Sequence, residues 1–418
     1  MSLRFARLRS GGRSLVHRWN TFFFTPQSAT PVALYRIIFG LLVIANLALL
    51  HGDWLTWFGA NGLVRPETLQ KLSPGLNLHW ALLVLQSDTC IQSFFWVFLL
   101  FAVFLTVGFQ TRLSSVLVFL FLNAIIRRNF YITNGGDSLL RAMGIFLMFA
   151  PAGGALSVDR LLRLCRAEEG VEPKQYWPWA QRMMQIQTAL VYISAFAWKS
   201  LGADWMNGTA IYYTSRLVEF QRFPMPTLES GLLLRIATWS TLVIEFAVGV
   251  LVWVRKLRYW ILLLGICLHL SIEYSMNIPL FQWIIMAGYV TFIDPADLSR
   301  SWAWVQRRAA WLGDPVDVLY DGCSIRSVRW VNVLHAIDIF ARLRFVDWQS
   351  AEGRTAWPDL SARQGQANLL IVAGNSLRAG FSGLISISRL VPLLWWLAPL
   401  SLTSGPGRGR LPALKATK

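Results

Sequence analysis

The sequence predicts an all-α polytopic membrane bundle of about eight spans, followed by a small C-terminal α/β domain. Of its 418 residues, 55% are hydrophobic and only 15% are charged, whereas charged residues make up about 25% of an average soluble chain. Many of the 21 tryptophans stand at the edges of apolar runs, where an interfacial aromatic belt would place them. After Asp294-Pro295 the long apolar runs stop and a β–α–β pattern begins.

The net charge of +17 could indicate binding to nucleic acid. However, Lys and Arg collect in the loops between apolar segments, which is typical of membrane topology. We therefore expect the lipid bilayer as a partner and no nucleic acid. The cysteines are scattered without a CxxC or metal-ligand spacing, so neither a disulfide framework nor a metal site is predicted. They are Cys90, Cys165, Cys267 and Cys323.

Residues 1–30 form a basic N-terminal segment with five arginines and no acid in its first 20 residues. It suits either an export signal or a cytoplasmic tail with an interfacial helix through Phe22–Phe24. No small-residue cleavage site follows the apolar run, which favours the tail. The transmembrane domain is expected over residues 31–296. Its predicted spans are about 32–50, 80–109 (tilted or broken near Ser87-Asp88), 113–126, 138–154, 183–201, 231–254, 259–276 and 279–293.

The distribution of Lys and Arg predicts the orientation of this integral, multi-pass protein. With a cytoplasmic N-terminus, the inner loops carry one, five and three basic residues, and the outer loops carry two, two, two and none. This bias follows the positive-inside rule and places both termini in the cytoplasm. The third and fourth spans are short, and a miscount there would invert half of the chain.

A lone lysine, Lys199, ends the fifth apolar helix, just before a turn-rich segment that holds Gly202 and Asp204. A lysine there can snorkel, with its stem on apolar surface and its ammonium at the interface. Alternatively it lines a buried polar cavity and acts as a base or a nucleophile. Asp204 is expected to cap a helix rather than to catalyse.

Other ionisable residues fall inside the predicted spans. Arg36, one turn into the first span, should face a protein interior or the headgroups. Glu245, in the sixth span, needs a partner such as Arg36 or Lys199. His269 and Glu273 stand one turn apart in the seventh span, where they could form a proton relay. The histidine could equally be buried and bonded to a backbone carbonyl.

The segment Asn134-Gly135-Gly136-Asp137 is typical of a tight turn whose aspartate caps the following helix. Asp137, together with Arg128 shortly before it, is therefore expected to order the turn.

Residues 314–400 contain the predicted α/β domain. Strands are expected at Val316–Tyr320 and Leu343–Trp348, with a helix between them at Ser324–Phe340, and a third candidate strand at 369–372. The apolar segment 390–400 is too short to span a membrane, so it should pack on this domain or touch the membrane surface. The tail 401–418 is predicted to be disordered.

Several short stretches, taken in order, resemble the HTTM family, the membrane domain related to vitamin K-dependent gamma-carboxylase. The resemblance covers about residues 20–300. The matching residues are Arg36 with Gly40, Asp53–Gly62, Arg128-Asn129, Asn134–Asp137, Pro151, Gly153, Ser157, Asp159, Lys199–Gly208 and His269.

The resemblance implies a lysine base acting on a quinol-like or lipid substrate. In the animal carboxylase a Lys-Lys pair precedes an Asp-Trp, and its second lysine deprotonates vitamin K hydroquinone before CO2 adds to a peptide glutamate. The first lysine matches Lys199, whereas the second matches Ser200, and a carboxylase histidine matches Gly136. A one-residue shift turns a helical side chain by about 100°. The resemblance thus implies lyase-like chemistry with Lys199 and His269 as site residues and a quinol or vitamin K-like hydroquinone as cofactor, while arguing against glutamate carboxylation.

The region from Val318 to about Pro399 resembles the DCC thiol-disulfide oxidoreductase family, which has a thioredoxin-like fold. Its hallmark is a strand, then Tyr-Asp-Gly, then a CxxC. Here Tyr320-Asp321-Gly322 is followed by Cys323, and Arg326 stands where the second cysteine would fall. A single cysteine cannot cycle between dithiol and disulfide, so oxidoreductase activity is not expected. Cys323 could still form mixed disulfides, or the domain could be a scaffold that docks a protein partner.

Three functions remain open. The chain could be a membrane enzyme with Lys199 and His269 facing an outer-leaflet cavity, a transport component, or a non-catalytic scaffold with a cytoplasmic thioredoxin-like docking domain. No inverted repeat of hydropathy supports transport. Convergence of Lys199, His269 and Glu245 would favour the enzyme over the scaffold.

Overall fold

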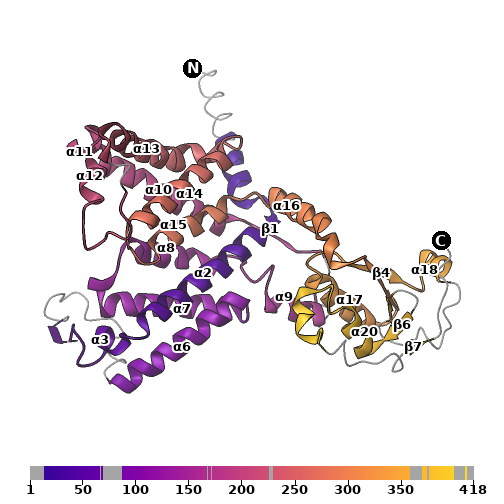
Figure 1. Cartoon of the computed structure of the whole chain (residues 1–418). Coiled ribbons are helices and arrows are strands. Elements are labelled where there is room, and N and C mark those ends of the chain that lie inside the picture. The colour runs from indigo at the N-terminus through magenta and orange to yellow at the C-terminus, as the bar shows by residue number, and fades with distance from the viewer. Residues whose placement is uncertain are drawn as a thin grey trace, which may run out of the picture. The chain divides into compact units, whose positions relative to one another are not determined.

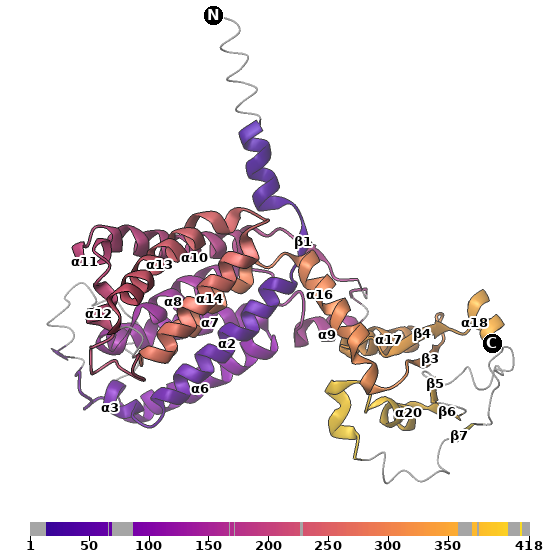
Figure 2. The same cartoon turned by 45° about the horizontal axis from the view of Figure 1, so that its top comes forward.

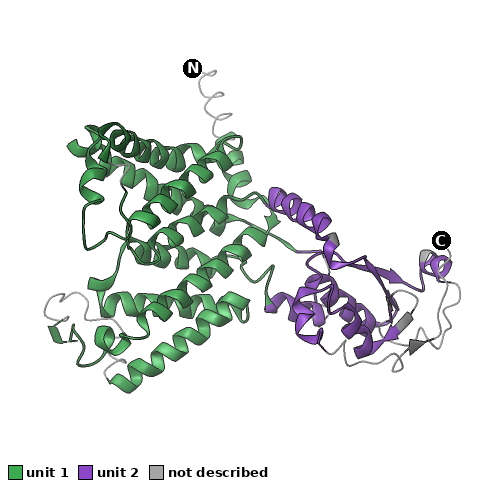
Figure 3. Ribbon diagram, viewed as in Figure 1, with its two compact units in different colours: residues 1–157, 174–294 green, residues 158–173, 295–418 purple. Residues whose placement is uncertain are grey.

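The computed structural model describes residues 14–65, 67–68, 87–166, 168–170, 172–225, 229–357, 370–373, 376–399 and 410–411. The chain divides into two compact units, coloured separately in Figure 3. The first consists of Met1–Ser157 and Lys174–Asp294, and the second of Val158–Pro173 and Pro295–Lys418.

The first unit is built almost entirely of helices (Figure 1). Its elements are β1 (Gln27–Ser28), α2 (Thr30–Leu50), α3 (Trp54–Phe58), α6 (Asp88–Val107), α7 (Thr111–Arg128), η2 (Phe130–Ile132), α8 (Gly135–Phe149), β2 (Gln175–Tyr176), α10 (Trp179–Ser200), α11 (Ala203–Met206), α12 (Ala210–Thr214), α13 (Gly231–Val250), η4 (Leu251–Trp253), α14 (Arg258–Ser275), α15 (Phe281–Tyr289) and η5 (Val290–Phe292). Residues 14–24 are helical as well, in agreement with the helix predicted through Phe22–Phe24.

Each predicted span coincides with a helix of the described residues. Three helices are long and apolar enough to cross a membrane: Thr30–Leu50, Asp88–Val107 and Gly231–Trp253. The break predicted near Ser87 is the start of α6, where the Ser87 hydroxyl accepts a hydrogen bond from the Cys90 N–H at 3.3 Å. Residues 80–86 of the second predicted span lie outside the described residues.

The other helices are shorter or more polar. Helix α8 has 15 residues and is therefore about 22 Å long, less than the ~30 Å of a bilayer core. Helices α7, α10 and α14 carry arginine or lysine near their ends. The chain is thus a helical membrane protein, and the count of eight spans stays a prediction.

Helices α2, α6 and α7 lie side by side, as Figures 1 and 2 show, and α10 packs on α13. Phe39, Phe98 and Leu122 belong to one continuous buried apolar cluster of this unit. A Cβ atom at Gly40 would collide with Thr106 of α6. The glycine therefore allows the backbones of α2 and α6 to approach closely, as small residues do between membrane helices.

Arg36 is completely buried and faces the protein interior, one of the two positions expected for it. Its guanidinium donates to the carbonyls of Ala152 at 2.6 Å and Leu156 at 2.5 Å. Longer bonds of 3.4 Å reach the carbonyls of Ala155 and Thr106. Arg36 therefore ties α2 to the chain that follows α8 and supplies donors to its carbonyls, of which those of Ala152 and Ala155 belong to buried residues.

Arg128 and Asn129 hold the segment around α3. Arg128 is buried and donates to the carbonyls of Gly59 and Val64, each at 2.7 Å. The Asn129 amide donates to the carbonyl of Trp57 at 3.1 Å. The predicted ordering role of Arg128 therefore extends to a segment more than 60 residues earlier in the chain.

The turn before α8 forms a capping box, whereas the sequence predicts Asp137 itself as the cap. The Asn134 side chain accepts from the Gly136 N–H at 2.7 Å, and the Asp137 carboxylate accepts from the Asn134 N–H at 2.8 Å. Asn134 is the N-cap, and Asp137 closes the box from the first turn.

The second unit contains a five-stranded sheet of order β4-β3-β5-β6-β7. Strand β3 is parallel to β4 and antiparallel to β5, and β6 is antiparallel to both of its neighbours. Val318 pairs with Phe345 of β4 and with Ile371 of β5. The elements are α9 (Val158–Cys165), α16 (Pro295–Arg308), η6 (Ala309–Leu312), β3 (Val316–Tyr320), α17 (Ile325–Ile337), β4 (Leu343–Asp347), α18 (Ala351–Ala356), β5 (Leu370–Ala373), β6 (Ser376–Ala379), α20 (Gly380–Ile387), η7 (Pro392–Leu397) and β7 (Arg410–Leu411).

Three features of this unit bear on the sequence predictions. The loop between the fourth and fifth predicted spans contains α9, which packs on α17 through a cluster that includes Leu161. Val391 and Leu394 join the same cluster, so the described part of segment 390–400 packs on this unit, which is one of the two alternatives predicted for it. The predicted disordered tail lies outside the described residues except for Arg410–Leu411, which pair with β6 as β7.

Replacing Arg36 with methionine should lower the free energy of unfolding by about 3 kcal/mol or more, because several buried carbonyls would lose their donor. Thermal unfolding of the purified protein in detergent measures this. Arg112→Met, at an exposed position on α7, is the matched control. Equal stability of the two variants would contradict the structural role of Arg36.

Candidate functional site

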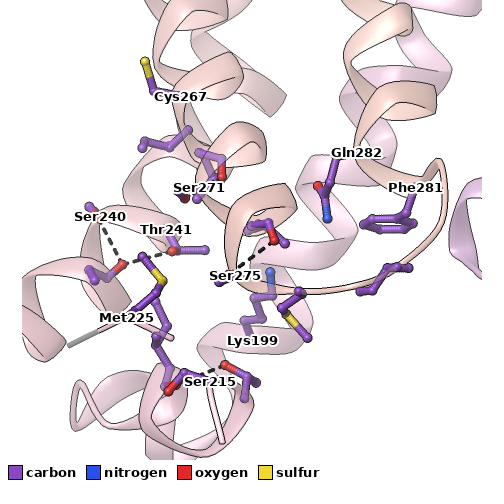
Figure 4. A pocket seen from close by; sticks show the side chains of 18 of the residues that line it. Lys199, Ser215, Met225, Ser240, Thr241, Cys267, Ser271, Ser275, Phe281 and Gln282 are labelled. Carbon is purple, nitrogen blue, oxygen red and sulfur yellow. Dashed lines mark hydrogen bonds between the residues drawn. The ribbon is translucent and has the colours of Figure 1, made fainter. Parts of the chain in front are cut away.

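A cavity of about 460 Å³ lies within the membrane unit, walled by residues of α10 to α15 and their connections (Figure 4). Most of its lining is apolar, including Ile211, Ile244 and Leu268. Two larger polar side chains, Lys199 of α10 and Gln282 of α15, also line it. Figure 4 shows the nitrogen ends of both directed into the space.

Lys199 forms an ion pair with Glu245 of α13. The carboxylate side chain is only 8% exposed and that of the lysine 30% exposed, so the pair is largely withdrawn from solvent. The ammonium also lies 4.8 Å from the ring centroid of Trp205, a cation–π contact. Lys199 is therefore held on the cavity wall, and it is the partner that Glu245 requires.

His269 is buried behind the wall of this cavity and is bonded to side chains, not to a backbone carbonyl. Its Nδ1 lies 2.5 Å from Oε1 of Gln282, and its Nε2 lies 2.5 Å from the hydroxyl of Tyr192. Tyr192 is in turn bonded to the hydroxyl of Tyr289. His269 is not among the described residues that line the cavity. It is connected to the cavity through its hydrogen bond to Gln282.

The donor roles in this chain of bonds follow from chemistry. An amide oxygen only accepts, so His269 Nδ1 carries the hydrogen. The neutral ring then accepts at Nε2 from Tyr192, whose oxygen accepts from Tyr289. All bonds from Tyr289 to Gln282 therefore run in one direction.

Glu273 does not take part in this chain. Its carboxylate accepts from Arg222 at 2.7 Å, and Arg222 also donates to Asn277 at 3.1 Å. The pair fastens the segment before α13 to the end of α14. The predicted relay along one face of α14 is thus replaced by bonds between helices.

The remaining predicted residues lie outside the described cavity lining. Arg36, Arg128 and Asp137 make the structural bonds given above. Asp204 stands in the first turn of α11, whose N-cap is Gly202, so the expected cap position is wrong by two residues. Its carboxylate accepts a long bond of 3.4 Å from the Thr209 hydroxyl.

In the second unit, Cys323 is exposed and precedes α17. Its thiol lies 3.4 Å from Oε1 of Gln349, and its N–H donates to the Asp321 carboxylate at 2.9 Å. All four cysteines are free. Within the described part of the chain, no cluster of three or more His, Cys, Asp or Glu could hold a metal ion.

The pairing of Lys199 with Glu245 predicts strong coupling between two substitutions. Lys199→Met and Glu245→Leu should each cost about 1–3 kcal/mol of stability, because each leaves the other charge without its partner. The double variant should be more stable than the sum of the two losses predicts. Chemical or thermal unfolding of the four proteins measures this coupling. Purely additive losses would contradict the pair.

The HTTM domain model matches residues 24–296 of this chain. The uncharacterised protein YitO of Bacillus subtilis (strain 168) is 20% identical over an alignment of 273 positions, which covers 59% of this chain and 81% of YitO. No solved structure matches the chain. The matched region covers the cavity, the Lys199–Glu245 pair and His269, and more than half of the sequence. The chain therefore belongs to the HTTM domain family of membrane proteins.

Proposed function

We propose that the membrane unit is an enzyme that binds a quinol-like or lipid-like molecule in the cavity and uses Lys199 as its base. The observation that carries this proposal is the Lys199–Glu245 pair on the wall of an apolar cavity. Ionisable residues inside a membrane domain are costly and are typically retained for function.

The pair suits proton transfer from a hydroxyl group. When Lys199 passes a proton to Glu245, the resulting neutral amine is able to accept a proton from a bound ligand. The ammonium formed in this way then faces the new oxyanion. Glu245 keeps the proton that it received and is therefore a neutral carboxylic acid. No step leaves an isolated charge in the low-dielectric interior.

The size and lining of the cavity favour a small amphiphilic molecule. Its volume of about 460 Å³ lies within the ~300–1,000 Å³ of ordinary ligand sites. The apolar wall suits an isoprenoid or acyl body, and the Lys199 end suits a polar head. A quinol or vitamin K-like hydroquinone has both parts.

In this proposal His269 positions the site rather than exchanging protons with the ligand. Both of its ring nitrogens are engaged, one by Gln282 and one by Tyr192. The histidine orients the amide of Gln282, which is the group that meets the cavity.

The chemistry proposed is carboxylase-like, but glutamate carboxylation is not part of it. Ser200 occupies the position of the second carboxylase lysine, and its hydroxyl bonds to the carbonyl of Ala197 at 2.9 Å. Gly136 occupies the position of a carboxylase histidine. A Cβ atom there would lie 2.8 Å from Oδ1 of Asn134 and 3.2 Å from the Cα of Phe281, so the turn and the start of α15 leave little room for a side chain.

For the second unit we propose a thioredoxin-like docking domain on the cytoplasmic side, with both termini in the cytoplasm. The strand order β4-β3-β5-β6, with a parallel β3–β4 pair and antiparallel neighbours, supports this fold. The Arg and Lys counts support the orientation. Cys323 without a second cysteine supports a binding role over disulfide exchange.

Lys199→Met should abolish binding of a benzoquinol that carries a ten-carbon tail, while expression and folding are retained. The charge and the hydrogen-bond donor at the polar end would both be lost. Equilibrium binding to the detergent-purified protein measures this, with Arg216→Met in the α12–α13 connection as the control. Unchanged binding to the Lys199 variant would eliminate the enzyme proposal and leave the scaffold.

Cys323→Ser should leave the pattern of disulfide-linked adducts unchanged, because a docking surface does not need a thiol. Non-reducing gels of cells treated with a thiol-trapping reagent provide the measurement. A mixed-disulfide adduct seen with the unmodified protein and lost in the variant would show that the thiol reacts, against this proposal.

A further inference from the structure

Gln282 carries a buried hydrogen-bond donor without a protein partner. The residue is 1% exposed, and among the described residues no group accepts from its Nε2. Its side chain lines the cavity, and Figure 4 shows the amide nitrogen directed into it. An unsatisfied buried donor costs about 1–3 kcal/mol, so a group supplied from outside the chain is expected to satisfy it.

The amide of Gln282 is contacted from behind by a histidine. Its oxygen accepts from Nδ1 of His269, and that ring is held by Tyr192 and Tyr289. Turning the amide over would require the other tautomer of the ring, with the hydrogen at Nε2, and would reverse the direction of the bonds to the tyrosines. In the orientation of the structure, the amide oxygen is used by His269 and the amide nitrogen faces the cavity.

The hydroxyl groups of the cavity wall are satisfied within their own helices or turns. Ser271 donates to the carbonyl of Leu268 at 2.7 Å, and Thr241 donates to that of Ala237 at 3.0 Å. The same holds for Thr214, Ser215, Ser240 and Ser275. The side-chain nitrogen donors of the described wall are those of Lys199, Trp205 and Gln282. Of these, Gln282 is the one whose buried N–H groups have no acceptor among the described residues.

We infer that Gln282 is a specificity-determining residue that donates to an acceptor oxygen on the polar end of the ligand. That oxygen is a carbonyl, a phenolate or an ether, near both Lys199 and Gln282, and the apolar body of the molecule lies along the rest of the wall. The inference rests on the proposed function for the presence of an amphiphilic ligand and adds which end of it is recognised.

The test uses the full-length protein in lipid nanodiscs and two probes with the same tail, decyl-substituted benzoquinone and decylbenzene. The shift of the unfolding temperature with probe concentration gives each dissociation constant. The unmodified protein should bind the quinone about 10-fold more tightly than decylbenzene. Gln282→Met should weaken quinone binding about 5- to 10-fold, the equivalent of one hydrogen bond, and leave decylbenzene binding unchanged.

Ser194→Ala, at an exposed position of α10 outside the cavity lining, is the matched control, because its hydroxyl donates to the carbonyl of Val191 at 2.9 Å, and it should bind both probes like the unmodified protein. If the methionine variant folds poorly, Gln282→Asn replaces it in the test. This variant keeps the amide but withdraws it by one methylene, and it should weaken quinone binding in the same way. Undiminished preference for the quinone in the Gln282 variants overturns this inference and leaves the proposed function standing. Failure of the unmodified protein to bind either probe overturns both.

Discussion

The ion pair between Lys199 and Glu245 is the constraint on which the membrane unit depends. Either charge alone is costly in an apolar interior, and α10 and α13 present these side chains to one another. The two helices pack against each other, and the pair stands where a cavity opens toward α14 and α15. The same requirement that stabilises the fold therefore places a proton-exchanging group beside a ligand-sized space.

The family motif is largely architectural. Arg36 binds the carbonyls that follow α8, and Arg128 binds those around α3. Each joins parts of the chain far apart in sequence and supplies donors where lipid cannot. Two of the motif residues, Lys199 and Trp205, line the described cavity. Membership of the family therefore indicates a scaffold with a site, and the residues around Lys199 decide its chemistry.

The helix positions, the turn at Asn134 and strands β3, β4 and β5 could be predicted because their signals are local: apolar run length, capping residues and alternation. The series of hydrogen bonds from Tyr289 through Tyr192 and His269 to Gln282 could not be predicted. It joins α10, α14 and α15, and each of its residues alone suits a helix core. A lone glutamine in the apolar stretch after Pro279 was the available signal. Strand β6 was missed because the alternation of Ser376–Ala379 extends over only four residues, and α9 was missed because its partner α17 is more than 150 residues away.

The most direct measurement of the central claim is a cryo-electron microscopy map of the protein purified in native lipid. The account predicts Lys199 paired with Glu245 and elongated density in the cavity, ending at hydrogen-bonding distance, ~3 Å, from both the lysine nitrogen and the Gln282 amide. A map in which Lys199 turns to the headgroups, apart from Glu245, beside a cavity without such density would contradict it.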